Sequence, residues 1–335
     1  MLKHLALSLL CCSLTLGACT KPADTPGGKL SVVYIPKNTG NPYFDPLIEG
    51  MKKACDENGA DFKSIAPADA GETSQLATLK AQIQQGVNVI EISPNSVEAL
   101  NPTLKEAMDK GITVITVDSD LTAHEEFRNA GVTTADVDGV GRSQIELMGS
   151  LIGYKGKFAI LSATTEAPNQ NRWIEAMKKT LKADAKYKDM ELVDVVYGND
   201  EPQKSLTEAE GLMTKYPDLA GIIAPTTVGI HASAQAVQNA KKADKVMVTG
   251  LGLPSEMRPY IKDGTVKAFA LWNPYDEGYL AGQVGIGLAK KTFAATTGTT
   301  FKAGTLGERT FIDKSIVITG DPFTFNKDTI DKFNF

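Results

Sequence analysis

The residues of this chain best suited to chemistry are polar and aromatic side chains that come directly after short apolar runs. Lys37 follows the run 30–35, and Asp118 and Asp120 follow the run 112–117. The other members of this set are Phe44, Asn169, Gln170, Trp173, Pro225, Thr226, Thr227, Gly252, Trp272 and Asn273. Sugar hydroxyls both donate and accept hydrogen bonds, and sugar C–H faces pack on aromatic rings. The set is therefore typical of a carbohydrate site.

Each candidate also has a plain structural explanation. Lys37 could be a solvated loop lysine, and Asp118 could cap the turn after its strand. Asn169 could be the N-cap of the next helix, a position that asparagine favours. Aromatic residues belong to a core more often than to a site, and for Phe44 and Trp173 both interpretations stay open.

An enzymatic site has less support in the sequence. The histidines are His4, His124 and His231, and they show no ligand spacing. A zinc site or a serine–histidine triad therefore has little to build on. Asp118 and Asp120 could form the carboxylate pair of a glycosidase, but both lie on one short loop, and Asp120 stays open between turn cap and ligand. We expect no catalytic residue, no metal and no cofactor.

Motifs for nucleotides and calcium are missing or incomplete. Neither a GxGxxG turn nor a GxxxxGK[ST] loop follows a predicted strand. Asp136 and Asp138 resemble part of a calcium loop, but the remaining ligands and the distal glutamate are absent. This segment is better explained as a turn followed by the start of a helix.

Short apolar strands alternate with amphipathic helices from Lys29 onward. The predicted strands are 30–35, 62–65, 87–92, 112–117, 158–162, 192–196, 221–224, 246–250 and 266–271. The predicted helices are 44–57, 74–85, 97–110, 171–182, 204–215, 230–240 and 256–262. Such alternation produces parallel sheets with right-handed crossovers, and two successive series predict an α/β fold of two doubly wound lobes. Ligands of such sheets bind beyond the carboxyl ends of the strands, where the candidate residues stand.

The first 21 residues have the pattern of a secretion signal. A lysine precedes an apolar run that is too short to cross a bilayer of about 30 Å as a helix, and residues 16–19, Leu-Gly-Ala-Cys, match a lipobox. We predict a signal peptide over 1–18, a lipid on Cys19 and a flexible tether over 19–28. The protein would then lie outside the cytoplasmic membrane, in the periplasm or on the outer face of the cell membrane, held by the lipid alone. The alternative is an ordinary cleaved signal in which Cys19 is incidental.

Composition excludes several kinds of partner. Apolar residues make up 42% of the chain and the formal net charge is −5, with no basic block. Nucleic acid is therefore not an expected partner. After Ala18 no apolar run is long enough for a second membrane segment. Of the cysteines, only Cys55 lies beyond the signal and Cys19, so we expect no disulfide in the mature chain.

Long stretches of the chain resemble a known family. The chain is similar to periplasmic binding proteins of type I, and within them to the rhamnose-binding and autoinducer-2-binding group of ABC transporter substrate-binding proteins. The stretches that carry this resemblance are APNQNRWI, GIIAPTTVGI, MRPYIKDGTVKAFALWNP and FKAGTLGE, at residues 167–174, 221–230, 257–274 and 301–308. The resemblance implies two lobes joined by a three-segment hinge, a ligand in the cleft between them, and ABC permease subunits as partners.

The resemblance also implies which sugar is bound. In autoinducer-2 receptors of this group the ligand contacts a lysine, an aspartate, an Asp-Gln pair and a Pro-x-Ala segment. The positions that match here are Lys37, Asp118, Gln170 and Pro225. Asn169 replaces the aspartate of the pair and Thr227 replaces the alanine. These departures favour rhamnose, and autoinducer-2 stays the alternative. A 6-deoxy sugar needs an apolar patch for its methyl group, for which the candidates are Phe44, Trp173 and Trp272.

The lobes that we predict combine distant parts of the chain. The first lobe comprises 29–131 plus 274–296, and the second comprises 132–273 plus 297–335. A cytoplasmic sugar-responsive repressor shares this fold, but it would need an N-terminal helix-turn-helix where this chain has a lipobox. We therefore expect a lipid-anchored monomer that delivers rhamnose or a close deoxy sugar to an ABC permease.

Overall fold

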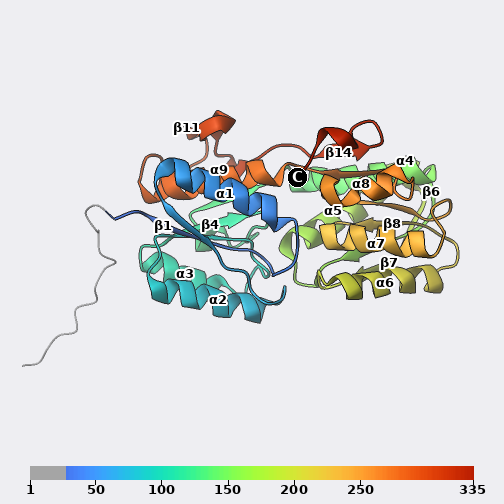
Figure 1. Ribbon diagram of the computed structural model, residues 1–335, viewed down its shortest axis with the longest axis horizontal. Helices are drawn as coiled ribbons and strands as arrows, with labels where there is room; N and C mark the ends of the chain where they lie inside the picture. The colour runs from blue at the N-terminus through green and yellow to red at the C-terminus, as the bar shows by residue number, and fades with distance from the viewer. Residues whose placement is uncertain (1–27) are drawn as a thin grey trace, which may run out of the picture.

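The computed structural model describes residues 28–335. The predicted signal peptide, Cys19 and all but the last residue of the predicted tether lie outside the described residues. Two α/β lobes lie side by side along the long axis of the molecule (Figure 1). Each has a sheet covered by helices on both faces, which confirms the predicted fold class.

The first lobe contains a six-stranded parallel sheet in the order β13-β5-β4-β3-β1-β2. Its strands are β1 (Ser31–Ile35), β2 (Asp61–Ser64), β3 (Val89–Ile92), β4 (Thr113–Val117), β5 (Ala130–Thr133) and β13 (Ile316–Ile318). Its helices are α1 (Phe44–Asn58), α2 (Glu72–Gln85), α3 (Asn101–Asp109) and α9 (Pro274–Ala289). Helices α1 and α9 pack together on one face of the sheet, and α2 and α3 cover the other (Figure 1).

The second lobe contains a four-stranded parallel sheet in the order β7-β6-β8-β9. A bridge between Leu251 and Ala270 extends it to β10, and β14 pairs antiparallel with β10. The strands are β6 (Lys155–Ser162), β7 (Asp189–Tyr197), β8 (Leu219–Ala224), β9 (Met247–Gly250), β10 (Ala268–Leu271) and β14 (Phe323–Asn326). The helices are α4 (Val137–Ile152), α5 (Pro168–Ala183), α6 (Pro202–Lys215), α7 (Thr227–Asn239) and α8 (Pro254–Lys262). The antiparallel edge strand departs from the all-parallel sheet that the sequence predicts.

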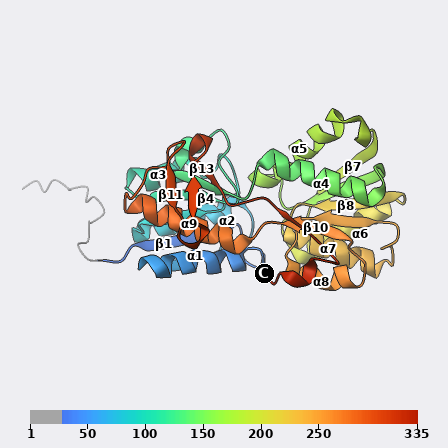
Figure 2. The ribbon, with the colours of Figure 1, turned by 90° about the horizontal axis from the view of Figure 1, so that it is seen from above.

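Smaller elements complete the chain. Strands β11 (Thr300–Lys302) and β12 (Glu308–Thr310) form a hairpin near α9 (Figure 2). Single 3₁₀ turns occupy Glu125–Phe127, Ala185–Tyr187, Gly304–Leu306, Asp313–Ser315 and Ile330–Lys332. Strand β5, helix α9 and strands β11 to β14 were not predicted from the sequence, and of helix α4 only the start was, at Asp136 and Asp138.

Three segments connect the lobes, at 134–136, 272–273 and 319–322. The first and third run side by side, because the backbone N–H groups of Thr319 and Gly320 donate to the carbonyls of Thr133 and Thr134. The number of connections matches the three-segment hinge that the resemblance implies.

One predicted boundary is wrong. Residues 297–335 were assigned to the second lobe, but the chain stays with the first lobe as far as Ile318. The reason is that β13 forms parallel hydrogen bonds with the edge of β5, with Val317 buried. Only β14 and the residues after it belong to the second lobe, and β5 carries the first segment of the first lobe to Thr133 rather than 131.

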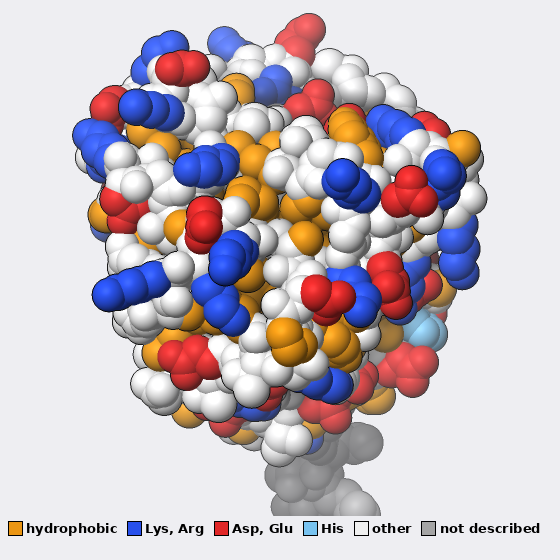
Figure 3. All heavy atoms as spheres, turned by 90° about the vertical axis from the view of Figure 1, so that its right-hand side faces the viewer, with side chains coloured by type: hydrophobic (Ala, Val, Ile, Leu, Met, Phe, Trp, Pro, Cys, Tyr) orange, Lys and Arg blue, Asp and Glu red, His pale blue; other side chains and the backbone are white. Residues whose placement is uncertain are grey.

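The described part of the chain contains no helix long and apolar enough to cross a membrane. Nor do residues 28–335 bring three or more His, Cys, Asp or Glu side chains together in a group that could hold a metal ion. On the end face of the second lobe, positive and negative side chains are interspersed (Figure 3).

Candidate functional site

A small cavity lies between the two lobes, where the carboxyl ends of the strands of both sheets face each other. Its volume is about 30 Å³. Its lining residues are Lys37, Asn41, Tyr43, Phe44, Asp118, Asn169, Gln170, Trp173, Asp200, Pro225, Thr226, Thr227, Leu251, Leu271 and Trp272. They follow strands β1, β4, β6, β7, β8, β9 and β10, which is the position that open α/β sheets use for ligands.

Most of the residues that the sequence nominated line this cavity. They are Lys37, Phe44, Asp118, Asn169, Gln170, Trp173, Pro225, Thr226, Thr227 and Trp272. The fold thus brings together side chains that lie as much as 235 positions apart in the chain. Their contact with a ligand stays a prediction.

Asp120 lies outside the cavity, although the sequence nominated it. Its carboxylate is buried and paired with the guanidinium of Arg128, at 2.5 Å from Nε and 2.6 Å from Nη2. Thr116 donates to the same carboxylate at 2.6 Å. Despite the cost of burial, the hydrogen bonds and charge of Arg128 hold the pKa of Asp120 below its usual range. Asp120 is therefore a structural ion-pair partner beside the site.

Gly252 and Asn273 also lie outside the cavity. The backbone N–H of Gly252 donates to the carbonyl of Ala270 at 3.1 Å, and a Cβ atom at this position would lie only 2.8 Å from the side chain of Met257. The Oδ1 of Asn273 accepts from the backbone N–H of Tyr275 at 3.1 Å. Asn273 therefore caps the N-terminus of α9.

Three polar residues of the cavity, Asn41, Tyr43 and Asp200, were not among those predicted from the sequence. Asn41 and Tyr43 lie in the segment after β1, beside Phe44, so the positional rule that predicted Phe44 also applied to them. Asp200 follows β7 and has a φ of 54°. The strand before it was predicted, so the rule that nominated Asp118 applied equally to Asp200.

One set of contacts between the lobes centres on Asn169. Lys37 Nζ of the first lobe donates to Oδ1 of Asn169 at 2.9 Å. Nδ2 of Asn169 donates to Oδ2 of Asp118 at 3.0 Å. Asp118 has a φ of 63°, a left-handed conformation that aspartate tolerates better than most residues. The second lobe thus presents a carboxamide to both an ammonium and a carboxyl group of the first.

A second set of interlobe contacts centres on Asn41. Its Nδ2 donates to Oδ2 of Asp200 at 3.2 Å, and its Oδ1 accepts from Oγ1 of Thr227 at 2.8 Å. Thr226 donates its hydroxyl to the other carboxyl oxygen of Asp200. The structure is therefore closed, with direct hydrogen bonds between polar side chains of opposite lobes.

Gln170 is fixed from the second lobe alone. Its Oε1 accepts from the hydroxyl of Ser162 at 2.6 Å and from the backbone N–H of Ala163 at 2.8 Å. Both partners lie at the end of β6. These two hydrogen bonds fix the orientation of the side-chain amide. Its Nε2 group can therefore donate to another acceptor.

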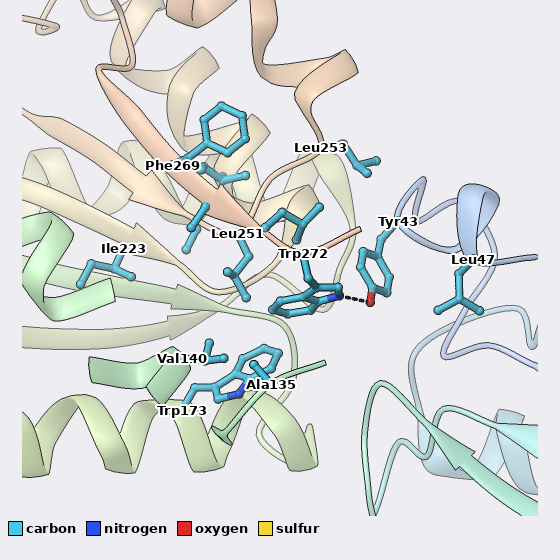
Figure 4. Close-up of a cluster of buried hydrophobic side chains, with 14 of the residues drawn as sticks. Tyr43, Leu47, Ala135, Val140, Trp173, Ile223, Leu251, Leu253, Phe269 and Trp272 are labelled. Carbon is cyan, nitrogen blue, oxygen red and sulfur yellow. Dashed lines mark hydrogen bonds between the residues drawn. The ribbon is translucent and has the colours of Figure 1, made fainter. Parts of the chain in front are cut away.

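An aromatic wall borders the polar groups. The ring of Trp272 lies 5.8 Å from that of Trp173 and 6.2 Å from that of Tyr43, and the Tyr43 ring is 5.2 Å from that of Phe44. Figure 4 shows Trp272 between Trp173 and Tyr43, with its indole nitrogen directed at the tyrosine hydroxyl. The cavity therefore offers both hydrogen-bonding groups and flat apolar surfaces.

Burial shifts the charges of the site toward neutrality. It lowers the pKa of Lys37, against the opposing pull of Asp118 and Asp200. It raises the pKa of Asp118, against the charge of Lys37, and raises the pKa of Asp200, against the hydrogen bond from Thr226. A neutral polar ligand suits such a cavity better than a multiply charged one, because burying uncompensated charge is costly.

A family model described as the periplasmic binding protein domain matches residues 32–292. This match covers most of the chain and both sides of the cavity. The chain belongs to the periplasmic binding protein family. This periplasmic binding protein is therefore a solute-binding protein and not an enzyme.

Solved structures and curated proteins with similar sequences agree with this assignment. The chain is 41% identical to a sugar ABC transporter protein from Actinomyces odontolyticus, with a TM-score of 0.72 over 91% of this chain and 98% of the other. It is 33% identical to an ABC transporter solute-binding protein from Clostridium phytofermentas with bound L-rhamnose, with a TM-score of 0.87 over the same shares. It is 26% identical to the D-ribose/D-allose-binding protein of Pseudomonas aeruginosa, over 79% of this chain and 83% of that protein. This periplasmic binding protein is thus similar to proteins that serve ABC transporters.

Proposed function

We propose that this chain, a substrate-binding protein of an ABC sugar importer, has L-rhamnose or a close deoxy sugar as its ligand. The observation that carries the proposal is the cavity itself, where polar side chains from both lobes pair with one another beside an aromatic wall.

The interlobe hydrogen bonds match what a sugar exchanges. Hydroxyl groups donate and accept, so they can replace the partners that Lys37, Asn169, Asn41 and Asp200 find in one another. The cavity, at about 30 Å³, is too small for a sugar ring. The lobes therefore separate to admit the ligand and close around it, and the ligand favours the closed form because it contacts both lobes.

The aromatic wall and the sequence departures favour a deoxy sugar. Phe44, Trp173 and Trp272 supply an apolar surface for the methyl group. The relative from Clostridium phytofermentas supports this choice, because its structure contains L-rhamnose. Asn169 and Thr227 depart from the autoinducer-2 pattern, and both make interlobe hydrogen bonds that an aspartate or alanine would alter.

The proposal includes the place of action. A lipid on Cys19 would anchor the mature chain at the membrane surface, next to ABC permease subunits, as a monomer. Radiolabelled palmitate incorporation into the native chain but not into a Cys19→Ala variant would support the anchor. Equal labelling of both would refute it.

Calorimetric titration of the purified protein tests the ligand. The panel contains L-rhamnose, L-fucose, D-ribose and autoinducer-2. We expect the tightest binding with L-rhamnose, with a micromolar dissociation constant, which corresponds to a binding free energy of about −8 kcal/mol. Binding of autoinducer-2 without L-rhamnose would replace the importer assignment with the receptor alternative, and failure of every sugar would refute the proposal.

A further inference from the structure

We infer that Glu277 is a positioning residue of the ligand site, which joins Tyr43 and Trp272 in one hydrogen-bonded unit and thereby sets the aromatic wall of the cavity. Glu277 does not line the cavity, but both of its partners do. The inference rests on the proposed function only for the choice of ligand in one arm of its test.

The unit joins two distant segments of the chain, the start of α1 and the stretch from Trp272 into α9. Glu277 lies in the first turn of α9 and is fully buried. Its Oε2 accepts from the hydroxyl of Tyr43 at 2.5 Å and from Nε1 of Trp272 at 3.2 Å. The same indole N–H lies 2.8 Å from the oxygen of Tyr43 (Figure 4). One carboxyl group therefore fixes a ring from the start of α1 and a ring from the second hinge segment.

A purely structural role does not explain the carboxyl group of Glu277. Its second oxygen, Oε1, forms no hydrogen bond of good geometry among residues 28–335, although the backbone N–H of Asp118 lies close enough to lower the pKa of the carboxyl group. A buried polar atom without a partner costs about 1–3 kcal/mol, so an apolar residue would fill this position with less loss of stability. The benefit of Glu277 therefore lies in orienting the two rings rather than in packing.

The groups that face Glu277 also make its protonation state matter for the charge of the site. They are Asp118 after β4, Tyr43 before α1, Tyr34 on β1 and the indole of Trp272. None is a cation. Tyr43 has one hydroxyl proton and lies near both Glu277 and Asp118, so the two carboxyl groups compete for it. Burial raises the pKa of Glu277 well above its usual range, which keeps the group neutral beside Asp118.

Two consequences follow for ligand binding. A neutral acid at position 277 leaves the aromatic wall in place for the apolar face of the ligand. Loss of its proton at alkaline pH puts a second negative charge beside Asp118 and weakens the closed cavity. A glutamine at this position keeps the acceptor oxygen and stays neutral at every pH.

The first arm of the test needs no ligand. The chain contains two tryptophans, Trp173 and Trp272, so its ¹H–¹⁵N spectrum has two indole signals that single Phe substitutions assign. Trp173 Nε1 is buried and has no assigned partner among the described residues, which makes it an internal control. We expect the Trp272 signal to move as the pH rises into the alkaline range, and Glu277→Gln to abolish that movement while the Trp173 signal changes less. A Trp272 signal that is identical in the native protein and in Glu277→Gln at every pH refutes the inference.

The second arm measures L-rhamnose affinity by calorimetry at pH 6 and pH 9. We expect Glu277→Gln to bind within threefold of the native protein at pH 6 and to weaken less at pH 9. We expect Glu277→Ala to bind at least tenfold more weakly. The control is Glu91→Gln, which changes another fully buried carboxyl of the same lobe, on β3 and outside the cavity. Equal weakening by Glu91→Gln and Glu277→Ala would refute the inference, because the effect would then belong to the stability of the lobe.

The two arms separate the possible failures. Should the native protein not bind L-rhamnose, the proposed function fails and the spectroscopic arm still decides the role of Glu277. Should Glu277→Ala not fold, the pH profile of Glu277→Gln in the spectroscopic arm decides it.

Discussion

Lys37 of the first lobe and Asn169 of the second are in direct contact, with Nζ donating to Oδ1 at 2.9 Å. Asn169 also donates to Asp118 at 3.0 Å. A single carboxamide therefore links an ammonium group and a carboxyl group of the opposite lobe. A hydroxyl group of the ligand can replace the partner of each of these three groups, so that none of them is left buried and unpaired.

Replacing Asn169 by aspartate should make ligand binding depend on pH. The new carboxyl group loses the donor to Asp118 and stands within hydrogen-bond distance of it, so the two acids raise each other's pKa. We expect L-rhamnose affinity at least tenfold below that of the native protein at pH 8, with partial recovery at pH 5.5. Titration calorimetry measures both. The matched control is Asn171→Asp, the same change in the same helix turn but outside the cavity, which should bind like the native protein.

Removing Asp118 should abolish binding and leave the fold intact. Its carboxyl group lies in the cavity and is buried at a cost that raises its pKa. For Asp118→Ala we expect at least a hundredfold loss of affinity, about 3 kcal/mol, with a free energy of unfolding within about 1 kcal/mol of the native value. Calorimetry and urea denaturation measure the two quantities. Unchanged affinity would remove Asp118 from the site.

Removing Asp120 should lower the stability of the fold and leave ligand affinity almost unchanged. Asp120→Ala leaves the guanidinium of Arg128 buried without its carboxylate partner. Breaking one half of a buried ion pair costs about 3–5 kcal/mol. We expect urea denaturation to show this loss, while the affinity of the folded protein for L-rhamnose changes less than threefold. A variant that keeps its stability and loses its ligand would return Asp120 to the site.

The buried carboxyl group of Glu91 should make the protein less stable as the pH rises. Burial raises its pKa to about 8, and both of its oxygens lack assigned partners among the described residues. The folded state therefore holds the proton that the unfolded chain releases near pH 4.3. Stability should fall between about pH 4.3 and 8, by up to about 1.4 kcal/mol per pH unit from this group. In Glu91→Gln the slope over this range should be smaller by that amount, as urea denaturation at several pH values can measure. An equal slope in both proteins would contradict this assignment.

Helix α9 should not tolerate a side chain at Gly278. A Cβ atom there would lie 1.9 Å from the backbone oxygen of Leu47 in α1, and Gly50 of α1 faces α9 just as closely. For Gly278→Ala we expect a loss of about 3 kcal/mol or more, because backbone rather than a flexible side chain blocks the new atom. The control is Gly211→Ala in α6, where nothing lies within 4 Å. That variant should gain up to about 1 kcal/mol, because alanine favours helix. Thermal unfolding compares the two.

The sequence by itself determined the alternation of elements and the edge of the sheets where the site lies. Apolar runs such as Val32–Ile35 and Ile222–Ala224 had to be buried, and parallel strands bring their carboxyl ends together. Lys37, Asp118 and Gln170 could be nominated for that reason alone. The period of the apolar pattern also separated the two series of strands and helices.

Only the tertiary structure decided which polar residues face the cavity and which are paired elsewhere. Asp118 and Asp120 are two positions apart in the chain. The buried guanidinium of Arg128 pairs with Asp120, whereas Asp118 lines the cavity. Likewise β13 joins the first lobe because an open strand edge on β5 receives it. Partners, unlike periodicity, depend on groups that come near only after folding, and so no local pattern in the chain could specify them.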